Sequence, residues 1–212
     1  VRMFCSVHYP DGRPFEADTR AILSRAVEAA DAEGLSFFFG PEMEFYLFQL
    51  DASAEPTNIP YDHAGYMDVA PEDKGENVRR EACLTLEQMG IRPESSHHEE
   101  GPGQNEIDFR YSDPLTAADN TATFKWIVRT KAASNGLYAD FSPKPIQNQA
   151  GSGMHINFSL SDSSKLKNAL AGILAHIAEI TYYLNPTENS YKRLGEQKAP
   201  KFICWGQETV LP

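Results

Sequence analysis

The sequence predicts an α+β fold in which helices pack on one face of a mainly antiparallel sheet. Gly and Pro residues divide the chain into alternating strand and helix signals. The connection at 99–103 has only about five residues, and a parallel crossover would need a dozen or more. The chain has 212 residues, of which 41% are hydrophobic and 23% charged, so it can form one globular domain with its own core.

Helices and strands are each predicted from their own pattern. Apolar residues recur at helical spacing in four segments: 19–34, 76–89, 113–136 and 164–184. Strand patterns occur at 35–50, 91–98, 104–111, 137–142, 153–160 and 201–205. The segment 51–75, rich in Pro, Asp and Gly, is predicted to be a long loop, and such loops are usually functional or mobile.

The ends of the helices carry their own signals. Asp18 or Thr19 can cap the first helix and Asp113 the third, because a side-chain oxygen accepts hydrogen bonds from the free N–H groups of a first turn. Gly34 and Gly90 end the first and second helices, and the Asn185-Pro186 pair ends the fourth. These ends give the helix boundaries that the apolar spacing alone leaves open.

Charge and composition exclude several classes of protein. The net charge of -11 would repel phosphate backbones, so no nucleic acid is expected as a partner. The three cysteines show no CxxC spacing and are interpreted as reduced thiols. The apolar stretch 170–180 is too short to span a bilayer, and no signal peptide opens the chain. We therefore expect a soluble, cytoplasmic protein.

The strongest chemical signal lies in the first predicted strand. Side chains alternate between the two faces of a strand, so Met43 and Phe45 share one face, and Glu42 and Glu44 share the other. Two carboxylates on one face repel each other unless a cation lies between them. A solvated strand face is the alternative, and it is the commoner explanation of an isolated Glu-x-Glu pattern.

Two further strands repeat the pattern. Glu106, Asp108 and Arg110 share one face of their strand, directly after the cluster His97-His98-Glu99. In the segment 153–160 one face carries His155, Asn157 and Ser159. Alone, a His-His pair is more often structural, and the glycine-rich segment 151–153 lacks the Lys of a P-loop.

Together the three strands favour a divalent-cation site. Carboxylates with one or two imidazoles suit Mg²⁺ or Mn²⁺, whereas zinc would be expected to recruit Cys. Such ions commonly hold nucleotide phosphates during phosphoryl transfer. The residues thus predict a phosphoryl-transfer site without naming its substrate, and a divalent-metal hydrolase stays open at this point.

Four segments, in order, resemble motifs of the glutamine synthetase family. They are Gly40-Pro41-Glu42-Met43-Glu44-Phe45, Ser96-His97-His98-Glu99 with Gly103-Gln104-Asn105-Glu106-Ile107-Asp108, Lys144-Pro145 with Gly151-Ser152-Gly153-Met154-His155, and Asn185-Pro186 with Asn189-Ser190-Tyr191-Lys192-Arg193-Leu194. The resemblance covers residues 39 to 194, and its order is specific although no single motif is. It implies a curved sheet and argues against a hydrolase.

The resemblance also implies roles, position by position. Glu44, Glu99 and Glu106 match ligands of one metal ion, and Glu42 and His155 match ligands of a second. Residues that match ATP contacts are Glu94, Tyr111, Asn157 and Ser159. Gly151 matches a backbone contact to glutamate, and Arg193 matches a catalytic arginine that binds the glutamate carboxylate.

The activity implied by the resemblance is the ATP-dependent ligation of ammonia to the γ-carboxylate of glutamate, with Mg²⁺ or Mn²⁺ and γ-glutamyl phosphate as intermediate. Ala150 stands where many members carry Asn, and the loop 195–200 departs from the family pattern. A γ-glutamyl–amine ligase of the same family is therefore an alternative, as is a non-catalytic metal- and nucleotide-binding module.

The family also implies expectations about the whole protein. Residues 1–212 correspond to a partial catalytic domain, lacking the small N-terminal domain and the later metal ligand and arginines of the family. Members form dodecamers of two stacked hexameric rings. We expect that this chain alone forms no closed ring and is nearly inactive.

Overall fold

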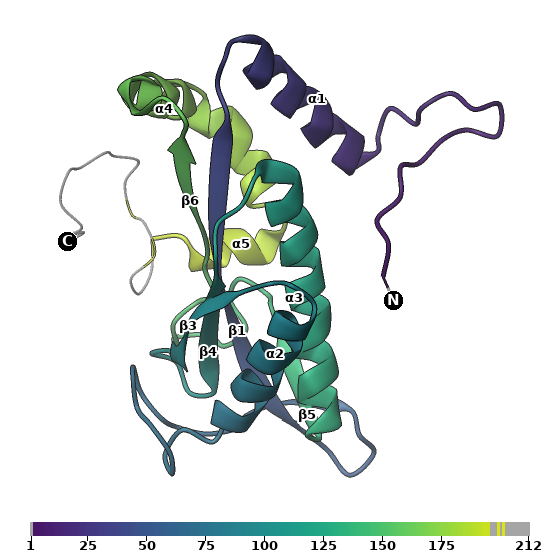
Figure 1. Ribbon diagram of the computed structural model, residues 1–212. Helices are drawn as coiled ribbons and strands as arrows, with labels where there is room; N and C mark the ends of the chain where they lie inside the picture. The colour runs from purple at the N-terminus through teal and green to yellow at the C-terminus, as the bar shows by residue number, and fades with distance from the viewer. Residues whose placement is uncertain (1, 196–198, 200, 202–212) are drawn as a thin grey trace.

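The computed structural model describes residues 2–195, 199 and 201 and shows a six-stranded sheet around one long strand. The central strand is β1 (Phe37–Leu50), and the others are β2 (Pro56–Pro60), β3 (Pro93–His98), β4 (Gln104–Phe109), β5 (Leu137–Asp140) and β6 (Met154–Leu160). β1 pairs with β2, β4, β5 and β6, and β3 pairs with β4. All these pairings are antiparallel (Figure 1).

The register places two strands on opposite edges of β1. Glu42 pairs with Asp108 of β4 on one side and with His155 of β6 on the other. β3 extends the sheet beyond β4, with His97 opposite Glu106. β3, β4 and β6 therefore lie beside the same part of β1. β4 and β6 pair with β1 directly, and β3 reaches it through its pairing with β4.

The core lies between one face of the sheet and two helices. Met43, Phe45 and Leu47 of β1 are buried against α2 (Glu76–Gln88) and α3 (Pro114–Ser134). Burying a large apolar side chain contributes roughly 1.5–3 kcal/mol relative to leaving it exposed. The apolar face of the strand is therefore fixed toward the helices, and the acidic face points away from them.

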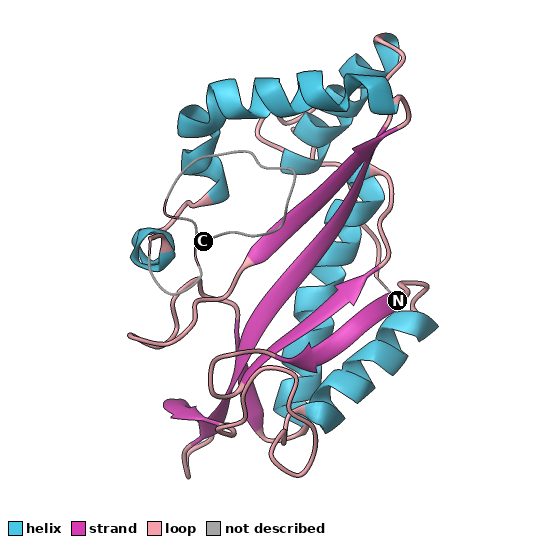
Figure 2. Cartoon of the chain, turned by 90° about the vertical axis from the view of Figure 1, so that its left-hand side faces the viewer, coloured by secondary structure: helices cyan, strands magenta, loops and turns pink. Residues whose placement is uncertain are grey.

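The remaining helices pack more loosely. α1 (Thr19–Ala32) contacts α3, and α4 (Leu166–Leu184) follows the 3₁₀ turn Ser163–Lys165; neither contains a buried residue. The short α5 (Glu188–Arg193) lies across the sheet from α3 and is seen nearly end-on in Figure 2. Its last residue can therefore reach the acidic face of the sheet.

The predicted fold class is confirmed, with two additions. β2 lies within the segment predicted to be a continuous loop, and α5 was not predicted. The predicted helix ends agree closely, since Asp18 and Asp113 are the observed caps. The strand predicted at 201–205 lies almost wholly outside the described residues. Within the described part of the chain, no helix is long and apolar enough to cross a membrane.

Candidate functional site

Carboxylates from three strands gather on the face of the sheet opposite the core. Glu42 and Glu44 alternate with the buried residues of β1. The β4 register places Asp108 beside Glu42 and Glu106 beside Glu44, and β6 places His155 beside Glu42 from the other edge. The three acidic strand patterns of the sequence thus form one surface.

Glu99 reaches this surface from the turn that follows β3. One of its oxygens, Oε1, lies 3.6 Å from Nδ1 of His97, and both side chains are largely buried. Burial, followed by the negative charge of Glu44, raises the pKa of Glu99 above its usual range. The three carboxylates predicted to share the first ion, Glu44, Glu99 and Glu106, therefore interact with one another.

Glu106 and Asp108 form a second acid–acid contact. Burial, a hydrogen bond with Asp108 and the surrounding carboxylates raise the pKa of Glu106 to about 9. Burial is also the first cause that raises the pKa of Asp108. Bound protons relieve the repulsion in this cluster, and a divalent cation would relieve the same repulsion once the carboxyl groups lose those protons. The donor set fits Mg²⁺ or Mn²⁺.

In the described residues, two groups of three candidate ligands come within 4.8 Å of one another. The first is His97, Glu106 and Asp108 on the acidic face, of which only Glu106 was a predicted ligand. The three ligands predicted for the first ion, Glu44, Glu99 and Glu106, do not all come within 4.8 Å of one another. His97 and Asp108 share the strand alternation of Glu106, and this pattern is the signal that could have added them to the site.

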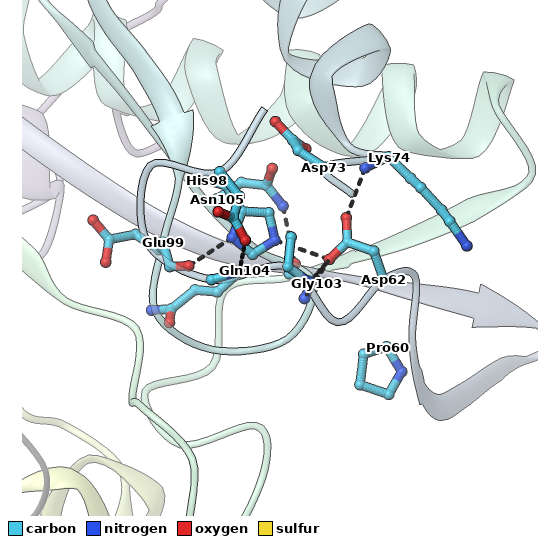
Figure 3. A network of polar contacts seen from close by, with 12 residues as sticks. Pro60, Asp62, Asp73, Lys74, His98, Glu99, Gly103, Gln104 and Asn105 are labelled. Carbon is cyan, nitrogen blue, oxygen red and sulfur yellow. Dashed lines mark hydrogen bonds and ion pairs between the residues drawn. The ribbon is translucent and has the colours of Figure 1, made fainter. Parts of the chain in front are cut away.

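The second group, Asp62, Asp73 and His98, lies behind the sheet and is occupied by protein donors (Figure 3). Asp73 accepts two hydrogen bonds from the Arg79 guanidinium, at 3.1 and 2.6 Å. Asp62 accepts N–H bonds from Lys74 and Gly103. We interpret this group as structural because its carboxylates already have partners.

Asp62 and His98 form a charged pair within that group. Burial alone would lower the pKa of His98, but the hydrogen bond and charge of Asp62 outweigh it and raise the pKa above its ordinary value. Burial alone would likewise raise the pKa of Asp62, but hydrogen bonds with His98 and backbone N–H groups lower it. Both shifts favour ionised partners.

The second predicted metal position joins β1 and β6. Oε2 of Glu42 lies 3.5 Å from Nδ1 of His155, and Oε1 of Glu42 accepts a hydrogen bond of 2.6 Å from the Asn157 amide. His155 and Glu42 keep part of their surface exposed. The two predicted ligands thus lie together, beside a residue predicted to contact ATP.

The residues predicted to contact ATP lie mainly toward the other end of β6. A Cβ placed on Gly40 would make ordinary contacts, at 3.4 Å with Cβ of Tyr111 and at 3.9 Å with Cβ of Asn157, so these two side chains flank Gly40. Ser159 pairs with Phe38 one step further along β1, and Tyr111 is 54% exposed. Glu94 lies apart, exposed on β3 where the pairing with β4 is irregular.

Two glycines adjoin the predicted substrate arginine. A Cβ on Gly153 would lie 2.7 Å from Oε1 of Glu44, 3.0 Å from Nε2 of His155 and 3.1 Å from a guanidinium nitrogen of Arg193. A Cβ on Gly151 would meet Cγ of Arg193 at 2.7 Å. A ligand of each predicted ion and the predicted substrate arginine therefore surround the space beside Gly153, which a larger residue would fill with its Cβ.

Gln104 and Tyr46 tie the glycine-rich loop to the carboxylates, and sequence reasoning missed both. The Gln104 amide donates to Oε2 of Glu44 at 2.7 Å and to the carbonyl of Gly151 at 3.2 Å. The Tyr46 hydroxyl donates to the carbonyl of Ala150 at 2.5 Å. Gln104 precedes Glu106 by two residues, so the alternation of β4 could have placed it on the site face.

Asn189 holds the same loop from α5. Its side-chain oxygen accepts from the Lys144 N–H at 2.6 Å, and its amide donates to the Lys144 carbonyl at 3.1 Å. Ser152 donates its N–H to the carbonyl of Pro143. The motifs around Lys144 and Asn189 are far apart in the chain but are joined by these two hydrogen bonds. Because Arg193 lies on the same helix as Asn189, the contact also holds Arg193 beside the loop.

The raised pKa of Glu106 predicts a pH dependence of stability. A carboxyl group whose pKa is raised by folding binds more protons in the folded state, so its stabilising effect is full below its unfolded pKa near 4.5 and declines as the pH approaches about 9. The melting temperature of the metal-free protein should therefore fall over this range. Glu106→Gln should flatten the slope in thermal unfolding; an unchanged slope would contradict the assignment.

The fold and this face define an α+β protein whose antiparallel sheet presents a carboxylate surface suited to divalent cations. A family profile described as glutamine synthetase, catalytic domain, matches residues 16–209. The chain belongs to this family.

Similar proteins agree with that membership. Glutamine synthetases of Thermus thermophilus and Methanosarcina mazei are 45% and 43% identical, over 97% and 98% of this chain and 50% of each relative. A cryo-EM structure of Plasmodium falciparum glutamine synthetase superposes with a TM-score of 0.80 at 26% identity, over 90% of this chain and 46% of that one. A GmaS/ADP complex gives 0.80 at 30% identity, over 90% and 48%. The chain spans about half the length of the curated relatives it matches.

Proposed function

We propose that this chain carries the metal- and nucleotide-binding part of a glutamine synthetase, which joins ammonia to the γ-carboxylate of glutamate with ATP. The observation that carries the proposal is the convergence around Gly153, where Glu44, His155 and Arg193 come within 3.1 Å of one point. Membership of the family supports it, because its relatives are named glutamine synthetase.

The acidic face would hold two Mg²⁺ or Mn²⁺ ions. Glu44, Glu99 and Glu106 are proposed for the first, and Glu42 and His155 for the second. When bound, such ions neutralise charge on the phosphates of ATP. The raised pKa values of Glu99 and Glu106 support this role, because a cation would relieve the repulsion that protons relieve in its absence.

The groups around the glycine-rich loop would orient glutamate. The Arg193 guanidinium can bind a carboxylate with two parallel hydrogen bonds, and the backbone of Gly151, whose carbonyl also accepts from Gln104, is proposed as the second contact. A γ-carboxylate oxygen of glutamate then attacks the γ-phosphorus of ATP, and the bond to the ADP oxygen breaks. Nitrogen of ammonia attacks the resulting acyl phosphate, phosphate leaves with the bonding electrons, and the extra proton passes to solvent. Positioning supplies most of the acceleration.

ATP would lie along β6 toward Tyr111. Asn157 and Ser159 offer polar groups on the exposed side of the strand, and the ring of Tyr111 offers an apolar surface. Glu94 is proposed as a further contact from β3. The hydrogen bond of Asn157 with Glu42 would couple nucleotide and metal binding.

A γ-glutamyl–amine ligase is the second candidate. Ala150 offers only its backbone near the substrate loop, and its carbonyl is already bonded to Tyr46. A dodecameric ring and a cytoplasmic location are further proposals that follow from the family, and a non-catalytic binding module is the third possibility.

Phosphate release tests the proposal, measured on an assembled full-length enzyme that contains these residues, because the 212-residue chain alone is expected to be nearly inactive. With ATP, glutamate and Mn²⁺ or Mg²⁺, release should require ammonia, and methylamine or ethylamine should substitute poorly. Equal or better use of an alkylamine would favour the second candidate. Binding of Mn²⁺-ADP without γ-glutamyl hydroxamate formation would favour the non-catalytic module, and phosphate release independent of glutamate would contradict both ligases.

A further inference from the structure

The turn between β3 and β4 carries Glu99, and it is anchored from behind the sheet. The residues of this turn, 99–103, connect His98 to Gln104. Asp62, from the segment between β2 and α2, lies directly behind it and is 3% exposed (Figure 3). A carboxylate buried to this degree requires polar partners.

Asp62 binds the exit of the turn directly and its entry through His98. Its Oδ1 accepts the Gly103 N–H at 3.0 Å and lies 2.9 Å from Nε2 of His98. Nδ1 of His98 lies 2.6 Å from the Glu99 carbonyl oxygen, which can only accept, so His98 is the donor there. Oδ2 of Asp62 accepts the Lys74 N–H at 3.0 Å, and this hydrogen bond holds the Asp62 carboxylate in place.

The other side of the turn leaves little freedom. Gly103 has a φ of +70°, its carbonyl accepts the Leu47 N–H at 2.8 Å, and a Cβ on it would lie 2.8 Å from the Leu47 carbonyl oxygen. The Glu99 N–H donates to the Gln104 carbonyl at 2.8 Å. In Figure 3 the Glu99 carboxylate points away from Asp62. The anchor therefore acts on the backbone of the turn and leaves the carboxylate available.

We propose that Asp62 is a positioning residue for the metal ligand Glu99, because one buried carboxylate fixes both ends of the turn that carries it. The inference rests on the proposed function, in which Glu99 binds an ion. It adds a residue from a segment without strand or helix periodicity, and it assigns a purpose to a buried charge pair that does not face the site.

A neighbouring pair offers a matched control. Asp73 and Arg79 are also buried and ionically paired, but Arg79 bonds onward to Ser96 and Asn105 within the strands. Among the described residues, neither Asp73 nor Arg79 itself bonds to residues 99–103, and Arg79 reaches them only through Asn105, whose amide donates to the Gly103 carbonyl at 2.9 Å. Asp73→Asn should therefore disturb stability in the same region without altering the orientation of Glu99.

The test is Mn²⁺ titration by calorimetry on the folded variants, with thermal unfolding of each. Asp62→Ala should weaken Mn²⁺ binding by about 10–100-fold, the usual effect of removing a group that orients a ligand. Asp73→Asn should destabilise the protein, because it weakens a buried ion pair, but should leave the Mn²⁺ affinity of the folded variant close to that of the unaltered protein. If Asp62→Ala does not fold, Asp62→Asn serves, because it keeps an acceptor for Gly103 while its amide opposes the Lys74 N–H.

A double substitution separates positioning from a general loss of order. In a Glu99→Gln background, either Asp62 variant should weaken Mn²⁺ binding no further, whereas in a Glu42→Gln background it should. Equal weakening in both backgrounds, or unchanged affinity in the Asp62 variants, would overturn the proposal. If Glu99→Gln alone leaves the affinity unchanged, Glu99 is not a ligand, and the failure lies in the proposed metal site itself.

Discussion

In an assembled enzyme that contains these residues, replacing Glu44 by glutamine should lower the proposed ligase activity by about 10²–10³-fold or more. Glu44 lies in register with Glu106, accepts a hydrogen bond from Gln104 and reaches the point beside Gly153 where Arg193 also arrives. Glutamine keeps the size of the side chain but removes the charge that a cation needs. Steady-state phosphate release measures the activity, and calorimetry should show weaker Mn²⁺ binding.

The control for this change is Glu55→Gln, which removes one negative charge from an exposed position outside the acidic face. It should leave both activity and Mn²⁺ affinity essentially unchanged. If Glu44→Gln behaves like Glu55→Gln, the β1 carboxylate has no part in metal binding. A fall in melting temperature large enough to unfold the Glu44 variant would instead show that its role is structural.

Gly153→Ala should nearly abolish activity while leaving the protein folded. The added Cβ would meet the ends of three flexible side chains, Glu44, His155 and Arg193, at 2.7 to 3.1 Å. Such ends can move at little cost to folding, but they are the proposed ligands and substrate contact. Misplacing reacting groups by about 1 Å commonly costs on the order of 10²-fold in rate. Activity and thermal unfolding are measured together.

Gly172→Ala is the matched control, since a Cβ there has nothing within 4 Å and lies within helix α4. This change should leave the rate unaltered and stabilise the helix slightly. Full activity of Gly153→Ala would mean that the space beside Gly153 is not needed. Unfolding of the variant would mean that the three side chains cannot yield.

The faces of the strands could be predicted from sequence, because the side-chain period of two leaves no other arrangement when one face is apolar. Met43 and Phe45 fixed the orientation of Glu42 and Glu44 in this way. The antiparallel partner also followed from the short connection at 99–103. Hence the acidic face was predictable before the strands that share it were placed together.

The supporting contacts could not be predicted in the same way. Asp62 lies in a segment without periodicity, and its partners His98 and Gly103 are 36 and 41 residues away in the chain. β2 was missed because Pro and Asn residues weaken a strand signal, although its pairing with β1 compensates for them. The contact between Glu106 and Asp108 depends on burial, which the alternation does not specify.

The most direct test of the account is a crystal structure with Mn²⁺ and ADP, in which anomalous scattering locates the ions. We predict one ion about 2.1 Å from oxygens of Glu44, Glu99 and Glu106, and a second bound by Glu42 and His155, facing the nucleotide phosphates. Mn²⁺ bound instead between Asp62, Asp73 and His98, or no ion on the acidic face at saturating Mn²⁺, would contradict it.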